Sequence, residues 1–73
     1  MKKVYRMHNL DCANCAAKME RAIQKIDGVQ EASVSFMAQK LVIVMDDDKA
    51  AEIMKLAHLA VSKVEPDCKI LGV

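Results

Sequence analysis

Residues 5–20, YRMHNLDCANCAAKME, contain the pattern that decides the fold of this chain. Polar and apolar residues alternate loosely over residues 2–7, which predicts a short strand. A polar stretch, residues 8–14, then leads into apolar residues that recur at intervals of three and four: Ala16, Met19, Ile23 and Ile26. That spacing predicts an amphipathic helix, and Asp27-Gly28 is typical of a helix end with glycine in the left-handed conformation.

The rest of the chain predicts two more strands, a second helix and a last strand. Residues 29–36 have a period of two, and the apolar run 41–45 predicts a strand that is covered more heavily. Residues 46–48, three aspartates, are expected to open and cap a helix. The predicted inner side of that helix consists of Ile53, Leu56, Ala57 and Ala60. Pro66-Asp67 predicts a turn before a strand over residues 68–71.

The predicted order is therefore strand, helix, strand, strand, helix, strand. Two right-handed split β-α-β units of this kind form an α+β, ferredoxin-like βαββαβ sandwich, a four-stranded antiparallel sheet with both helices on one face. At 73 residues the chain is expected to form a single domain, residues 1–73. This topology places the end of the first strand beside the start of the fourth, so residues 11–15 and 65–68 should lie at the same end of the molecule.

Composition and charge exclude several classes of function. Hydrophobic residues make up 53% of the chain without any Trp, and the formal net charge of +1 gives no electrostatic case for nucleic acid or an anionic membrane. The longest aliphatic run, residues 41–45, is far shorter than the ~20 residues that span a bilayer, and the N-terminus lacks the apolar region of a signal peptide. We therefore expect a cytoplasmic, monomeric domain that does not insert into a membrane.

Three cysteines, an odd number, argue against a disulfide framework.

Cys12 and Cys15 form a C-x-x-C pair with three chemical interpretations. A thiol-redox couple expects a larger domain and an aromatic residue beside the pair. A closed zinc site needs four ligands, and the remaining candidates lie at no recognisable spacing: Cys68, His8 and His58. An open metal site is favoured, because a helix N-terminus lowers thiol pKa values and the thiolate is the form that binds metal.

The chain resembles the heavy-metal-associated domain, a module of soluble metallochaperones and of the cytosolic N-termini of metal-transporting P-type ATPases. The resemblance rests on residues 5–20, on IDGVQEASVSF at residues 26–36 and on VEPD at residues 64–67. It implies the ferredoxin-like fold and metal ligands at Cys12 and Cys15. It also implies that this domain is not itself an enzyme and that its partners are the other cytosolic or membrane domains of such an ATPase.

Asp11 bears on the choice of metal. Copper-handling members of the family usually have Met-Thr before the first cysteine, whereas this chain has Leu10-Asp11 and so resembles the N-terminal domains of ATPases that export zinc, cadmium or lead. A carboxylate beside two thiolates favours a divalent ion over Cu(I). The alternative is that Asp11 only caps the helix. Copper chaperones of the family also place a Lys before the fourth strand, where this chain has Pro66 next to Glu65.

Other residues carry weaker expectations. Cys68 alternates in phase with Ile70, which predicts a buried thiol, although the topology leaves open a third sulfur ligand. Glu65 is a candidate additional ligand at the same end. Three cations line one side of the first helix and form either a solvated face or a docking surface for an acidic partner: Lys18, Arg21 and Lys25.

The sequence therefore predicts a domain that captures and transfers Cd(II), Zn(II) or Pb(II), as the N-terminal domain of a heavy-metal-exporting P-type ATPase. Two alternatives stay open. The first is a free-standing metallochaperone of the same fold, including one for Cu(I). The second is a thiol-redox protein that uses the same cysteine pair.

Overall fold

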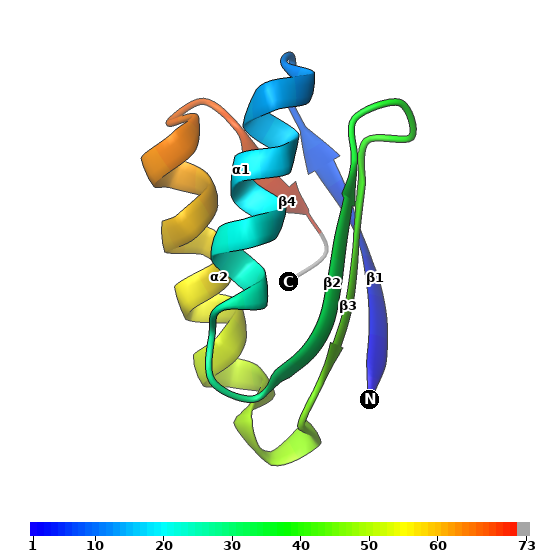
Figure 1. Ribbon diagram of the computed structural model, residues 1–73, viewed down its shortest axis with the longest axis vertical. Helices are drawn as coiled ribbons and strands as arrows, with labels where there is room; N and C mark the ends of the chain where they lie inside the picture. Colours follow the sequence, from blue (N-terminus) through cyan, green and yellow to red (C-terminus); the bar gives the residue numbers. More distant parts are fainter. Residues whose placement is uncertain (72–73) are drawn as a thin grey trace.

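The secondary structure follows the predicted order of strands and helices (Figure 1). The computed structural model describes residues 1–71, so the last two residues of the predicted 1–73 domain lie outside the described part. The elements are β1 (Lys2–His8), α1 (Ala13–Gln24), β2 (Val29–Ser35), β3 (Lys40–Met45), a short 3₁₀ helix η1 (Asp47–Lys49), α2 (Ala50–Val64) and β4 (Lys69–Leu71).

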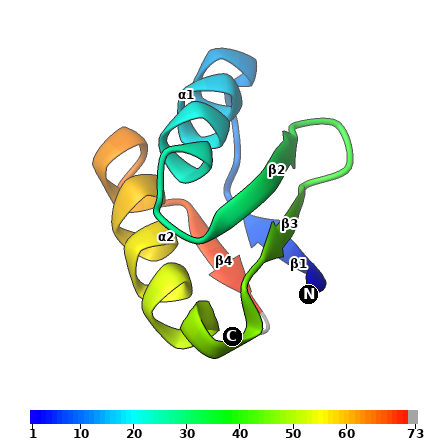
Figure 2. The same ribbon diagram turned by 60° about the horizontal axis from the view of Figure 1, so that its bottom comes forward.

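The four strands form one sheet in the order β2-β3-β1-β4, and every neighbouring pair is antiparallel. In the central strand β1, Tyr5 lies opposite Leu41 of β3, and Met7 lies opposite Ile70 of β4. Both helices cover the same face of this sheet (Figure 2). The predicted ferredoxin-like α+β sandwich is therefore confirmed.

The core lies between the helices and the sheet and is built from aliphatic residues and methionines. The residues of β3 that face the helices are completely buried: Leu41, Ile43 and Met45. They meet the predicted inner face of α1, where Met19 and Ile23 are also completely buried and Ala16 is nearly so. Burial of each large apolar side chain contributes about 1.5–3 kcal/mol, which is how a chain this short holds its sheet and helices together.

The buried face of α2 differs from the predicted one. Its buried residues are Ile53, Met54, Ala57 and Val61. Leu56, predicted to face the core, is 47% exposed, and Ala60 is only partly buried. Helix α2 packs against both α1 and β4, and these neighbours decide which of its residues are buried. Hydrophobicity alone did not distinguish Leu56 from Met54.

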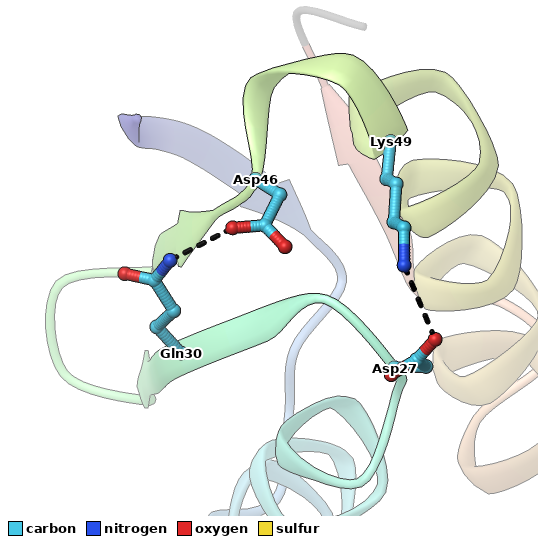
Figure 3. A network of polar contacts seen from close by, with 4 residues as sticks. All are labelled: Asp27, Gln30, Asp46 and Lys49. Atoms are coloured by element: carbon cyan, nitrogen blue, oxygen red, sulfur yellow. Dashed lines mark hydrogen bonds and ion pairs between the residues drawn. The ribbon is translucent and has the colours of Figure 1, made fainter.

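The three aspartates before α2 do not make the predicted cap hydrogen bonds, and Figure 3 shows Asp46 directed at Gln30 instead. Asp47 and Asp48 lie in η1, and Lys49, the residue that precedes α2, makes no side-chain cap hydrogen bond. Asp46 instead accepts a hydrogen bond from Gln30 Nε2 at 2.9 Å. Its neighbourhood is held to the α1–β2 turn by an ion pair between Lys49 Nζ and Asp27 Oδ2 at 3.4 Å, which raises the pKa of Lys49.

The α1–β2 turn needs the glycine that the sequence places there. Gly28 has φ +94°, and a Cβ added to it would lie 2.9 Å from Ile53 Cδ1. Helix α1 itself ends earlier than Asp27, at Gln24, and the next residues form tighter i→i−3 hydrogen bonds. Gly28 therefore lets the turn pack closely on α2.

Candidate metal-binding site

The loop between β1 and α1 is fixed two residues before the first cysteine. Leu10 is 2% exposed, so its side chain anchors the loop in the core. Its main chain is held by the side-chain amide of Gln39: the Leu10 N–H donates to Oε1 at 3.2 Å, and Nε2 donates to the Leu10 carbonyl at 2.6 Å. Asn9, in the left-handed region with φ 61°, donates from Nδ2 to the Asp67 carbonyl at 3.3 Å.

Cys12 and Cys15 come together at the start of α1. Cys12 is the extended residue before the helix, with φ −136°, and its carbonyl accepts a hydrogen bond from the Ala16 N–H at 3.0 Å. Cys15 lies in the first turn, and both side chains are half-buried. Both thiols therefore lie near the surface, at the positive end of the helix.

The two thiols are chemically unequal. Hydrogen bonding from the main-chain N–H of Cys15, and to a smaller extent from its thiol, lowers the pKa of Cys12. Because the Cys15 thiol is the donor in this contact, the pKa of Cys15 is raised. Cys12 is thus the sulfur that most readily becomes a thiolate, the form that binds metal.

Residues of the α2–β4 connection lie at the same end, as the topology predicts. Burial raises the pKa of the Cys68 thiol, and the charges of Glu65 and Asp11 raise it further. The pKa of Cys15 is raised mainly by its contact with Cys12 and by burial, and to a smaller extent by the negative charge of Glu65. Figure 1 shows the start of α1 and the connection after α2 at one end of the molecule.

The remaining predicted residues lie around this pair. Asp11 is exposed, and the N-terminus of α1 has no side-chain cap hydrogen bond, so the alternative role of Asp11 as a cap is not seen. Cys68 is 2% exposed, as expected for a buried thiol, and Glu65 is half-buried. Within residues 1–71, no three His, Cys, Asp or Glu side chains are already arranged to hold a metal ion.

The three predicted docking cations are all exposed, Lys18 and Arg21 on α1 and Lys25 directly after its end. Among the weaker influences on the thiols, Lys18 lies near enough to lower the pKa of both Cys12 and Cys15. In the part of the chain that the structure describes, no helix is long and apolar enough to cross a membrane.

Two residues of the site were missed by the sequence analysis. Asn9 belongs to a residue type that tolerates positive φ, and this property could have indicated a bend in the loop. Gln39 carries no such signal, because it meets the loop only through contacts 29 positions away in the sequence.

Comparison with known proteins identifies the family of this chain. The sequence model of the heavy-metal-associated domain family matches residues 4–65 of this chain. Over 64 residues the chain is 41% identical to a cadmium-transporting ATPase of Staphylococcus aureus, covering 88% of this chain and 9% of the ATPase. Over 71 residues it is 38% identical to a cadmium, zinc and cobalt-transporting ATPase of Helicobacter pylori, covering 93% of this chain and 10% of that protein. The chain thus spans about a tenth of the length of these relatives.

Solved structures share the fold. The CopZ metallochaperone superimposes with a TM-score of 0.76 at 21% identity, covering 97% of this chain and 100% of that one. The N-terminal domain of a potential copper-translocating P-type ATPase from Bacillus subtilis, in the Cu(I)-loaded state, gives 0.75 at 27% identity, covering 97% of this chain and 86% of that one. With a family match over most of its length, the chain belongs to the heavy-metal-associated domain family, whose members are metal-binding modules rather than enzymes.

Proposed function

We propose that this domain captures a divalent soft or borderline ion, Zn(II), Cd(II) or Pb(II), through the sulfurs of Cys12 and Cys15 with Asp11 as third ligand. It would act as the cytosolic N-terminal domain of a heavy-metal-exporting P-type ATPase and pass the ion to the transport part of that protein. The cadmium- and zinc-transporting ATPases among its relatives support this proposal.

The observation that carries the proposal is the pair of half-buried cysteines at the N-terminus of α1, where the main-chain N–H of Cys15 lowers the pKa of Cys12. N–H groups at the helix start stabilise thiolate, and two sulfurs leave the coordination sphere of the ion incomplete. Incomplete coordination at the surface lets a ligand from another domain enter before the first ligands leave. Such a site suits transfer of an ion better than permanent storage.

Charge favours a divalent ion. Two thiolates and Cu(I) sum to −1, and a third, carboxylate ligand from Asp11 would bring the site to −2 with Glu65 close by. Two thiolates, one carboxylate and a divalent ion sum to −1 instead. Carboxylate oxygen also prefers the harder, divalent ion. With zinc, we expect Zn–S bonds of ~2.3 Å and a Zn–O bond of ~2.0–2.2 Å.

The surrounding residues have supporting roles in this proposal. Glu65 would offer a carboxylate during transfer, and the softer Cd(II) and Pb(II) would gain most from Cys68 as a third sulfur. The exposed cations on α1 and at its end would meet an acidic surface of the receiving domain: Lys18, Arg21 and Lys25.

The test is competitive titration of the reduced domain with Zn(II), Cd(II), Pb(II) and Cu(I), followed by native mass spectrometry. We expect Asp11→Asn to weaken binding of the divalent ions by at least ~10-fold and to leave Cu(I) nearly unchanged. Asp67→Asn is the matched control, since Asp67 is an exposed acid at the same end.

Other outcomes would identify the alternatives. Equal loss for all four ions, or no loss, would contradict a ligand role for Asp11. Tight Cu(I) binding that is indifferent to Asp11→Asn would indicate a copper chaperone. Weak metal binding, together with turnover of a Cys12–Cys15 disulfide by a thioredoxin-type reductant, would indicate a redox protein.

A further inference from the structure

Gln39, in the β2–β3 turn, uses its whole side-chain amide to hold the loop that precedes Cys12. Oε1 accepts the Leu10 N–H at 3.2 Å, while Nε2 donates to the carbonyls of Leu10 at 2.6 Å and of Phe36 at 2.8 Å. The one acceptor and both donor hydrogens of the amide thus have partners. The reverse orientation of the amide would direct its oxygen at two carbonyls, so only this orientation fits.

The backbone of Gln39 contributes to the same connection. Its carbonyl accepts a hydrogen bond from the Met7 N–H at 2.8 Å, so the turn holds both the end of β1 and the loop after it. Gln39 has φ 53°, a left-handed conformation that glycine and asparagine adopt more easily than glutamine does. A turn alone would be served better by either of those residues. The side chain of Gln39 therefore has a role beyond the turn.

We infer that Gln39 is a positioning residue for the metal loop. By fixing both main-chain polar groups of Leu10, it limits the freedom of the next two residues, Asp11 and Cys12, and keeps Cys12 facing Cys15. Groups that orient metal ligands typically change affinity by about 10–100-fold when they are removed. The effect on metal affinity rests on the proposed function, whereas the effect on the loop does not.

Two variants separate positioning of the loop from stability of the turn. Gln39→Gly removes the amide but relieves the positive φ. Gln39→Glu keeps the size of the side chain and an acceptor for Leu10, but it presents a carboxylate to the carbonyls of Leu10 and Phe36. Both changes thus remove the amide donors that hold the Leu10 carbonyl, but only Gln39→Gly relieves the positive φ of the turn. Met37→Ala is the matched control, because Met37 lies in the same turn and is 90% exposed.

The first measurement is hydrogen exchange of the Leu10 amide in the metal-free domain, together with urea unfolding of each variant. We expect exchange to be at least ~10-fold faster in Gln39→Gly while its unfolding midpoint stays near that of the wild type, and unchanged in Met37→Ala. The second measurement is Zn(II) affinity, which we expect to fall ~10-fold in both Gln39 variants.

Unchanged exchange at Leu10 in Gln39→Gly would overturn the inference, and so would wild-type Zn(II) affinity in both variants. If the wild-type domain binds none of the divalent ions, the proposed function fails. Faster exchange at Leu10 would then still support the hold of Gln39 on the loop.

Discussion

At the scale of single residues, the three cysteines occupy three different environments. The N–H and thiol of Cys15 favour thiolate at Cys12, the Cys15 thiol acts as a donor, and Cys68 is buried. The pKa of Cys12 is therefore lowered, and the pKa values of Cys15 and Cys68 are raised. Because only thiolate reacts and binds metal, these environments rank the three thiols by reactivity.

We predict that iodoacetamide near pH 7 modifies Cys12 first, Cys15 more slowly, and Cys68 hardly at all in the folded, metal-free domain. The measurement is peptide mass spectrometry over a time course of alkylation. In denaturant, where the environments are lost, all three should react at similar rates. Modification of Cys68 as fast as Cys12 in the folded domain would contradict the buried position.

Cys68 should also make stability depend on pH above neutrality. Its thiol keeps its proton to higher pH when folded than when unfolded, where the pKa is near ~8.5. Above that pH the unfolded state binds fewer protons, so the free energy of unfolding falls as pH rises toward the folded pKa. In urea unfolding at several pH values from 7 to 10, we expect a steeper fall for the wild type than for Cys68→Val. Parallel curves would show that Cys68 does not cause this pH dependence.

At the scale of elements, the sequence predicted those features that arise from local periodicity. The order of strands and helices and the buried side of α1 followed from spacing, since burial on one face imposes a period. The topology then placed Cys68 beside the cysteine loop. These parts of the fold and of the site could therefore be predicted without coordinates.

Contacts between distant segments could not be predicted in this way. Asp46, directly after β3, binds Gln30 of the neighbouring strand β2 rather than capping α2, and Gln39, directly before β3, binds Leu10 just beyond the end of the neighbouring strand β1. Leu56 and Met54 are similar in hydrophobicity, so only the packing of α2 against its neighbours decides which is buried. Whether Asp11 is a metal ligand stays a prediction, because ligation depends on an ion as well as on the chain.

The corrected face of α2 gives a prediction for stability. Met54 is 4% exposed and Leu56 is 47% exposed. We expect Met54→Ala to lower the free energy of unfolding by about 2–5 kcal/mol, because it leaves a cavity in the core, and Leu56→Ala by less than about 1 kcal/mol. Urea denaturation of the two variants checks this. Equal losses of unfolding free energy would instead support the buried face that hydrophobic spacing predicted, with Leu56 in the core.

At the scale of the whole molecule, the domain is small and its stability is expected to be modest. A ligand that binds only the folded state therefore produces a measurable change. We predict that Zn(II) raises the Tm of the reduced domain, by an amount equivalent to about 2.7 kcal/mol when free Zn(II) is 100 times the Kd.

Differential scanning calorimetry with and without Zn(II) measures this rise. Cys15→Ser is the control, since it removes one ligand at a half-buried position, and it should lose most of the rise. A similar rise in that variant would place Zn(II) elsewhere on the molecule.

The hydrogen bond between Cys15 and Cys12 has a further consequence for the thermodynamics of ion capture. Both sulfurs bind an ion as thiolates, so binding must release to solvent the protons that they hold, above all that of Cys15, whose pKa is raised. Capture is therefore an exchange of metal for hydrogen ion: between the pKa of Cys12 and that of Cys15 the affinity should weaken about tenfold for each pH unit lost, and below both about a hundredfold. The heat measured by calorimetry should then vary with the ionisation enthalpy of the buffer, and acidification alone should drive the ion out of the domain.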